Sequence, residues 1–286
     1  MSKLEISAQK AIKCGLGQLG VLIPMSLPPY TYTMDFIEKF VEVGGDILFI
    51  PFMTPAVRMP WMMGGTEQQA DILAYKQGIT SDMNWEIIAK AREKYPEKPI
   101  IVVSFFNDIV GYGVERFAEN CRKYQVDGLD TPGYSYVTSK DYIKYGQKLF
   151  EAGSGLIHPI STDLALAPEG TPEYNLLYDM ICAGTGFLFI MTDAAGKSGG
   201  TGSIPVEKMK PATARIKEIQ KKAGNIIPVI TVCGIATPQN AEEAVIQVGT
   251  DGVMLASAVV RKILAGDSID AIGEYLRSIK NAMKLR

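Results

Sequence analysis

The chain has 286 residues, of which 47% are hydrophobic and 21% charged, and its formal net charge is −2 at pH 7. This length suits one large domain with a substantial core, and the lack of a basic excess argues against nucleic acid or a membrane surface as a partner. No apolar run approaches the ~18 residues that a transmembrane helix needs, and the first residues do not resemble a secretory leader. We therefore expect a cytoplasmic protein.

Short β-rich runs alternate with helical patterns along the chain, which is typical of parallel βαβ units. A helix is predicted near Ile6–Lys13. Eight strands are predicted after it, at Gly20–Ser26, Asp46–Phe52, Pro99–Phe106, Gly128–Thr131, Gly155–Ile160, Phe187–Thr192, Ile226–Val232 and Gly252–Leu255. Several of these strands are entered through a turn that contains aspartate, at Asp46, Asp127 and Asp251.

Eight strands without a linker, a low-complexity segment or a block of charge between them predict a particular α/β fold. This is one (β/α)8 TIM barrel domain over residues 1–286. An open doubly wound sheet is the alternative, but no G-x-G-x-x-G turn between a strand and a helix supports it.

The cysteine and histidine content argues against a structural metal. The four cysteines are far apart and form no C-x-x-C pair, so we expect reduced thiols at Cys14, Cys121, Cys182 and Cys233. The chain has one histidine and no cluster of metal ligands, so no metal site is expected.

Small residues follow the last two predicted strands. Gly234 lies in the run Cys233-Gly234-Ile235-Ala236, and Ala256-Ser257-Ala258 follows Leu255. Small residues let backbone N–H groups approach a ligand, and a helix N-terminus adds the positive end of its dipole. Barrels of this class commonly bind phosphate after strands 7 and 8. The two runs of small residues together therefore predict a site for a small phosphorylated substrate. The alternative is that they are ordinary βα turns, which also prefer small residues.

The segment Ala194–Ser203 contains four glycines and follows the sixth predicted strand. We interpret it as a lid over the ligand, since the loops on this face of a barrel carry function. A surface loop without a function is the alternative.

Several motifs in matching order resemble the tryptophan synthase α subunit family from about Gly20 to Ile263. They include Ile50-Pro51-Phe52, the run from Thr66 to Thr80, Ala91–Pro96, Asp130-Thr131-Pro132, Cys233-Gly234-Ile235 and Ala256–Val260. The resemblance implies a (β/α)8 barrel that cleaves indole-3-glycerol phosphate without metal or cofactor, beside a pyridoxal-phosphate β subunit. It also implies a phosphate site on the N–H groups near Ser198, Gly199, Gly234, Ala256 and Ser257.

The family's two acid–base carboxylates have no counterpart here. Phe49 stands where the resemblance places a strand-2 glutamate, and the strand is two residues shorter. The family's aspartate in the following loop is also missing, because no Asp or Glu occurs between Asp46 and Glu67. A phenyl ring cannot exchange a proton. Phe49, Phe105 and Phe189 are expected to line an unusually apolar substrate pocket.

Other groups could supply the proton transfers. His158 is predicted at the end of the fifth strand, where barrel enzymes carry active-site groups, and imidazole titrates near neutrality. Asp130 ends the fourth predicted strand, and Asp193 directly follows the sixth at the root of the lid. Each also has a structural interpretation: a satisfied core histidine, a scaffold aspartate and a hinge hydrogen bond.

The loop Met59–Met63, with the sequence MPWMM, is an apolar cluster of adaptable contact residues. Three interpretations are open: it covers a different substrate, it binds a protein partner or a second copy of the chain, or it is an ordinary buried loop.

Two hypotheses follow for the function. The first is an aldolase-type lyase on a small phosphorylated substrate, with His158, Asp193 and Asp130 as rearranged acid–base residues. The second is an inactive relative that binds a phosphorylated ligand or a partner protein.

Overall fold

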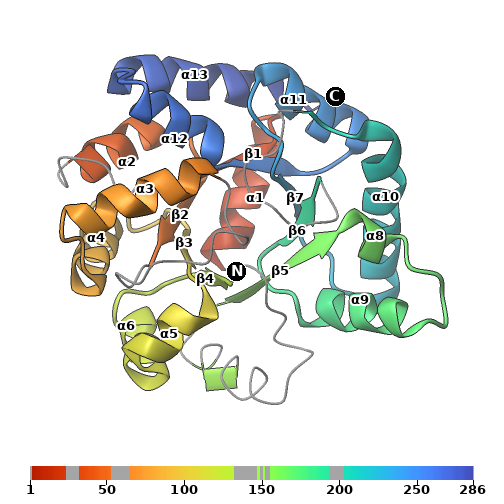
Figure 1. Ribbon diagram of the computed structural model, residues 1–286. Helices are drawn as coiled ribbons and strands as arrows, with labels where there is room; N and C mark the ends of the chain where they lie inside the picture. The colour runs from red at the N-terminus through yellow and green to blue at the C-terminus, as the bar shows by residue number, and fades with distance from the viewer. Residues whose placement is uncertain are drawn as a thin grey trace.

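The computed structural model describes residues 2–23, 32–52, 65–131, 147–148, 151, 155–192 and 203–285. Within them, eight parallel strands hydrogen-bond in chain order and close into a barrel (Figure 1). The strands are β1 (Gln18–Leu22), β2 (Ile47–Pro51), β3 (Ile100–Val103), β4 (Gly128–Asp130), β5 (Gly155–Ser161), β6 (Leu188–Met191), β7 (Val229–Val232) and β8 (Gly252–Leu255). The predicted (β/α)8 barrel is confirmed.

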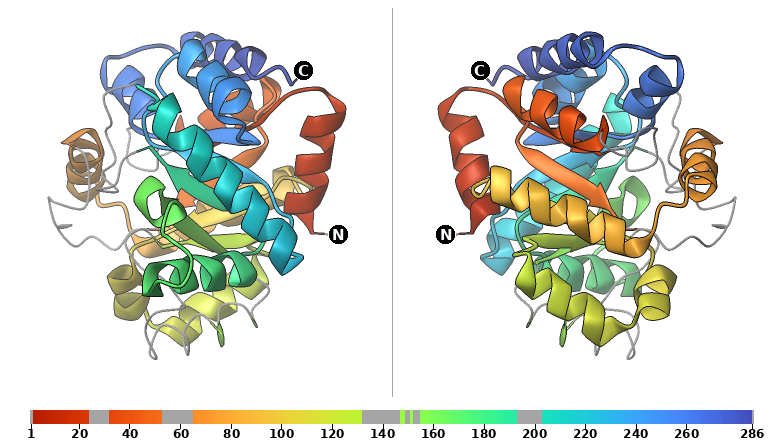
Figure 2. Two further views of the ribbon diagram at one scale, coloured as in Figure 1. Left: turned by 90° about the vertical axis from the view of Figure 1, so that its right-hand side faces the viewer. Right: turned by 90° about the vertical axis from the view of Figure 1, so that its left-hand side faces the viewer.

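Helices surround the strands on the outside of the barrel (Figures 1 and 2). They are α1 (Lys3–Lys13), α2 (Tyr32–Glu42), α3 (Gly65–Lys76), α4 (Ser81–Lys94), α5 (Phe106–Tyr112), α6 (Val114–Lys123), α8 (Thr162–Ala165), α9 (Pro172–Ala183), α10 (Val206–Ala223), α11 (Pro238–Glu242), the π-helix η2 (Glu243–Val248), α12 (Ser257–Leu264) and α13 (Ile269–Ala282). None of the described helices is long and apolar enough to cross a membrane.

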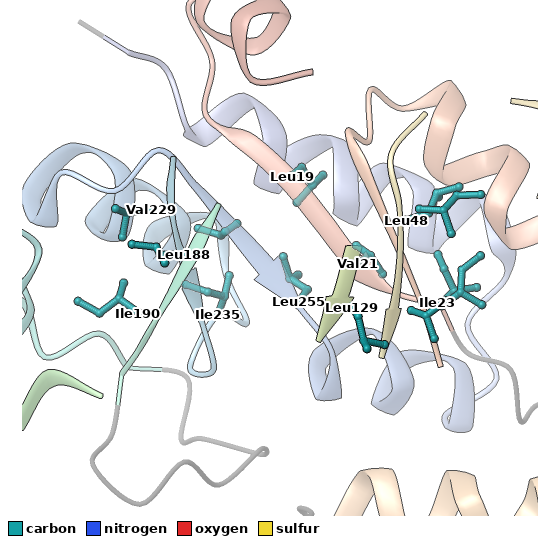
Figure 3. Close-up of a cluster of buried hydrophobic side chains, with 14 of the residues drawn as sticks. Leu19, Val21, Ile23, Leu48, Leu129, Leu188, Ile190, Val229, Ile235 and Leu255 are labelled. Carbon is teal, nitrogen blue, oxygen red and sulfur yellow. The ribbon is translucent and has the colours of Figure 1, made fainter. Parts of the chain in front are cut away.

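The strands bury two apolar layers because successive side chains point to opposite faces. The inner cluster fills the barrel and consists of Leu4, Ile47, Phe49, Ile101, Ile157, Phe187, Phe189, Ile230 and Met254. The outer cluster lies between the strands and the helices, and Figure 3 shows part of it, including Leu19, Leu48, Leu188 and Leu255. A strand residue of the inner cluster therefore points into the barrel, and one of the outer cluster points toward the helices.

Helix α1 covers the amino-terminal end of the barrel, and Figure 2 shows it beside one end of the strands. Its Leu4 is part of the inner cluster. Gly186 has a φ of +80°, and a Cβ there would lie 2.4 Å from Leu4 Cδ1, so only glycine allows this close approach. The interior of the barrel is thus filled by side chains at this end.

A repeated hydrogen bond joins the strands in pairs at the amino-terminal end. A side chain just before each even-numbered strand accepts from an N–H at the start of the preceding strand. Asp46 accepts from Leu19 N at 2.7 Å, Asp127 from Ile100 N at 2.9 Å, Thr185 from Leu156 N at 2.9 Å and Asp251 from Val229 N at 2.8 Å.

Each of the three aspartates also pairs with a cation, namely Lys280 with Asp46, Arg92 with Asp127 and Lys217 with Asp251. The hydrogen bonds to the side chains satisfy backbone N–H groups that the strand pairing of the barrel leaves without an acceptor, and the cations balance the charge of the three aspartates. The aspartate-containing turns predicted from the sequence therefore hold this end of the barrel together.

Candidate active site

The opposite, carboxyl end of the barrel forms a mouth whose inward-facing side chains are partly exposed. Alternation from the inner cluster places one or two residues of most strands there. They are Leu22, Pro51, Val103, Pro159, Ser161, Met191, Val232 and Ala256. Leu22, Val103, Val232 and Ala256 pack directly against the inner cluster. Ser161 is the polar member, and its Oγ accepts from Leu164 N at the start of α8.

Three phenylalanines form the floor beneath the mouth. The ring of Phe49 stacks on Phe189 at a centroid distance of 5.6 Å and meets Phe187 edge-on at 5.9 Å. Gly20 makes room for it, since a Cβ there would lie 2.4 Å from Phe49 Cε2. Phe49 and Phe189 are fully buried in this stack, so they support the mouth from below. Phe105 is partly exposed at the rim, as the N-cap of α5.

Asp130 is the last residue of β4 and faces the inside of the barrel. It shares its side of the strand with Gly128, where a Cβ would meet Ile101 and Ile157 of the inner cluster. The residue is only 6% exposed, and none of the described side chains hydrogen-bonds to its carboxyl group. Burial raises the pKa of Asp130 from 3.8 to about 7. A carboxyl group with this pKa can both accept and donate a proton near neutrality.

His158 does not lie at the end of its strand, so that prediction is wrong. Strand β5 continues through Pro159 to Ser161, which puts His158 in its middle, opposite Leu188 of β6. Its side chain shares the outer face with Ile160, an outer-cluster residue, whereas Ile157 points inward. It is 0% exposed, neither ring nitrogen has a hydrogen-bond partner among the described residues, and burial lowers its pKa to about 4. His158 therefore faces away from the mouth.

The sequence prediction of a helix N-terminus after β8 agrees with the geometry. Ala256 is the N-cap of α12, and its carbonyl accepts from Val259 N at 3.0 Å and Val260 N at 3.2 Å. Ser257, the first residue of the helix, is buried at the mouth. The positive end of the α12 dipole thus points to this face of the barrel.

Gly234, after β7, is not at a helix N-terminus, which corrects the prediction for this loop. Helix α11 begins only at Pro238, because Thr237 and Asn240 form its capping box. The N–H groups of Ala236 and Thr237 both donate to Asn240 Oδ1, at 3.2 and 3.1 Å. Any ligand contact here would come from the loop backbone near Gly234, which has a φ of +73°.

The remaining candidates lie outside the described residues. These are Asp193, Ser198 and Gly199, together with the loop Met59–Met63. In the part of the chain that the structure describes, no group of three or more His, Cys, Asp or Glu side chains could hold a metal ion.

Tyr275 is a residue near the mouth that sequence reasoning missed. Its hydroxyl donates to the carbonyl of Ala236 at 3.0 Å, from helix α13 to the loop after β7. The two residues are 39 positions apart, and no local motif signals such a contact.

The fold and the mouth define a (β/α)8-barrel protein whose candidate site combines an inward-facing carboxyl group with small residues after β7 and β8. The family model described as "Tryptophan synthase alpha chain" matches residues 21–284. The chain therefore belongs to the tryptophan synthase alpha chain family.

Individual relatives are distant but similar over their full length. The alpha chain of Vibrio parahaemolyticus is 28% identical over 289 residues, covering 99% of each chain. The alpha chain of Dehalococcoides mccartyi is 24% identical and covers 91% of this chain and 93% of its own. Among solved structures, the alpha subunit of Legionella pneumophila superposes with a TM-score of 0.78 at 20% identity, over 99% of this chain and 98% of its own. A chain of Mycobacterium tuberculosis tryptophan synthase has a TM-score of 0.80 at 20% identity, over 100% and 99%.

Proposed function

We propose that the chain is an aldolase-type lyase that cleaves a carbon–carbon bond in a small phosphorylated substrate, using acid–base residues different from the family's usual pair. The observation that carries the proposal is Asp130. This inward-facing carboxyl group at the end of β4 has a pKa near 7. Membership in a family of indole-3-glycerol-phosphate lyases supports the reaction class.

In the proposed reaction, Asp130 accepts the proton of the substrate hydroxyl. The carbon that bears this hydroxyl becomes a carbonyl carbon. The neighbouring carbon–carbon bond breaks, and its electron pair goes to the departing carbon. That departing carbon then takes a proton from Asp130 or from Asp193, which is separated from the end of β6 only by Thr192 in the sequence. Protons and electrons balance within the substrate and the carboxyl groups, and the proposed reaction uses no cofactor. The outward direction of His158 removes it from our proposed set.

The phosphate group is proposed to lie on backbone N–H groups near Gly234, Ala256 and Ser257, with Ser198 and Gly199 contributing as the resemblance implies. The α12 N-terminus at Ser257 supports this position. The loop Met59–Met63 is our proposed contact for a protein partner or a second copy of the chain, because Met and Trp are enriched in interfaces.

Turnover of a panel of phosphorylated polyols and aldehydes, followed by carbonyl release, tests the proposal. Asp130→Asn should lower kcat by about 10²–10⁴-fold while phosphate binding persists, since the amide cannot exchange the proton. The wild-type pH profile should have a limb near pH 7 that the variant lacks. Asp163→Asn, an exposed acid in α8, is the matched control and should keep full activity.

Failure of every panel member to turn over, with phosphate binding intact, would instead support the inactive relative. The burial of Phe49, at the position where the resemblance places the strand-2 glutamate, favours this second candidate. Unchanged activity in Asp130→Asn would contradict the role of Asp130.

A further inference from the structure

The loop between β7 and α11, residues 233–237, has an unusual backbone. Cys233 and Gly234 are consecutive residues with φ values of +69° and +73°. A non-glycine residue seldom adopts this left-handed conformation, and it persists only where surrounding contacts hold it. The contacts of this loop therefore determine where its N–H groups point.

Some of these contacts are local and fix the shape of the loop. Asn240 Oδ1 accepts from Ala236 N and Thr237 N, and Asn240 N donates to Thr237 Oγ1 at 3.1 Å. On the other side, a Cβ at Gly234 would lie 2.9 Å from the carbonyl oxygen of Ser203 and 3.1 Å from Thr192 Oγ1. Gly234 is thus fitted closely against the end of β6.

Tyr275 supplies a contact from outside the loop. Its hydroxyl donates to the Ala236 carbonyl at 3.0 Å. Burial raises the pKa of Tyr275 to about 12, so the hydroxyl stays protonated and remains a donor at physiological pH. This hydrogen bond thus ties the loop between β7 and α11 to helix α13.

The same tyrosine also contacts α12, the helix whose N-terminus is the second proposed phosphate contact. Lys262 Nζ lies 4.9 Å from the centroid of the Tyr275 ring, within the range of a cation–π interaction. Helix α13 lies against both α11 and α12 (Figure 1). One side chain therefore touches both elements that carry the proposed phosphate site.

We propose that Tyr275 is a positioning residue for this site: it holds the β7 loop at the distance from the α12 N-terminus that a phosphate group requires. This inference rests on the phosphate site of the proposed function. Tyr275 itself would not touch the ligand, since its hydroxyl is bonded to the loop carbonyl.

Titration with inorganic phosphate and with glycerol 3-phosphate, followed by calorimetry, tests the inference. Tyr275→Phe keeps the ring over Lys262 and removes only the hydroxyl, so the Ala236 carbonyl loses this donor. Phosphate affinity should fall about fivefold, the effect of losing one ordinary hydrogen bond. With a turned-over substrate, KM should rise by a similar factor and kcat should be unchanged.

Tyr174→Phe is the matched control. The Tyr174 hydroxyl also donates a hydrogen bond, to Glu169, but Tyr174 lies in α9, and among the described residues it bonds neither the β7 loop nor α12. It should bind phosphate like the wild type, and the unfolding midpoints of both variants without phosphate should show that they are folded. Equal phosphate affinity in Tyr275→Phe, Tyr174→Phe and the wild type would overturn this inference alone. No phosphate binding by the wild type would overturn the phosphate site and the inference together.

Discussion

Asp130 and His158 lie on neighbouring strands and face opposite sides of the sheet, and burial shifts the pKa of each toward its neutral form. The pKa of Asp130 rises to about 7 and that of His158 falls to about 4. The carboxyl group opens toward the mouth of the barrel, whereas the imidazole lies between the strands and the helices. The same physical cause therefore gives one residue a pKa suited to proton transfer and gives the other only an effect on stability.

His158 should make the folded state sensitive to acid. Its folded pKa of about 4 lies below the unfolded value of 6.5, so its contribution is complete above pH 6.5 and is lost as the pH falls through 4. His158→Leu removes the titrating group. Between pH 7.5 and pH 4, the free energy of unfolding of the wild type should fall by about 3 kcal/mol more than that of the variant.

Urea unfolding at several pH values measures this difference. Asp130 contributes the opposite slope, because a raised carboxyl pKa makes stability fall as the pH rises from about 4 to about 7. Asp130 is present in both proteins, so the difference between their free energies of unfolding reports only the titration of the His158 imidazole. Parallel pH profiles for the two proteins would contradict this prediction, because they would mean that the folded protein stabilises the charged form of His158 as well as water does.

The paired strands at the amino-terminal end provide an internal comparison at the scale of elements. Asp127 accepts from Ile100 N and pairs with the buried Arg92, which also donates to the carbonyls of Pro96, Lys98 and Gln125. Thr185 occupies the equivalent place before β6 as a neutral group. The two positions differ mainly in whether a charge is involved.

Asp127→Ala should lower the free energy of unfolding by about 3–5 kcal/mol, because it leaves the Arg92 charge buried without its partner. Thr185→Val removes a single neutral hydrogen bond and should cost about 1 kcal/mol. Denaturant unfolding at pH 7 compares them. Equal losses would mean that Arg92 finds sufficient compensation in its carbonyl contacts.

The order of the elements could be predicted from the sequence, since period-2 and period-3.6 patterns alternate throughout. The ends of the strands were less predictable. Strand β7 begins at Val229, directly after Pro228, and β5 extends past Pro159 to Ser161. The placement of His158 failed because alternate side chains of a strand face opposite sides, and His158 shares the outer face with Ile160.

The candidate site was predictable only where it is local. A helix shortly after β8 and a strand that ends close to Asp130 follow from short motifs, although α12 begins at Ser257, earlier than predicted. The bond from Tyr275 to Ala236 and the stack of Phe49 on Phe189 join distant segments, so no pattern within one segment reveals them.

At the scale of the whole molecule, the family fold persists although a relative such as the Vibrio parahaemolyticus alpha chain is only 28% identical. We predict that the chain does not cleave indole-3-glycerol phosphate by the standard mechanism, even beside a tryptophan synthase β subunit. Phe49 is packed in the barrel floor, and no Asp or Glu lies between Asp46 and Glu67. Loss of each positioned acid or base removes about 10²–10⁴-fold in rate.

An indole-release assay on the purified chain, alone and with a β subunit, checks this prediction. The Vibrio parahaemolyticus alpha chain is a suitable positive control. Robust release by this chain would contradict the prediction and would mean that other groups, such as Asp130 or Asp193, perform the proton transfers.

The filled amino-terminal end of the barrel also determines by which end a ligand can enter and leave. Leu4 and the phenylalanine stack fill the interior, so whatever enters at the carboxyl end must leave by the same opening. If a substrate is cleaved into two fragments inside the mouth, the fragment nearer the opening must leave first. The deeper fragment can leave only after it. The amino-terminal helix, far from any chemistry, would thereby impose the order of product release.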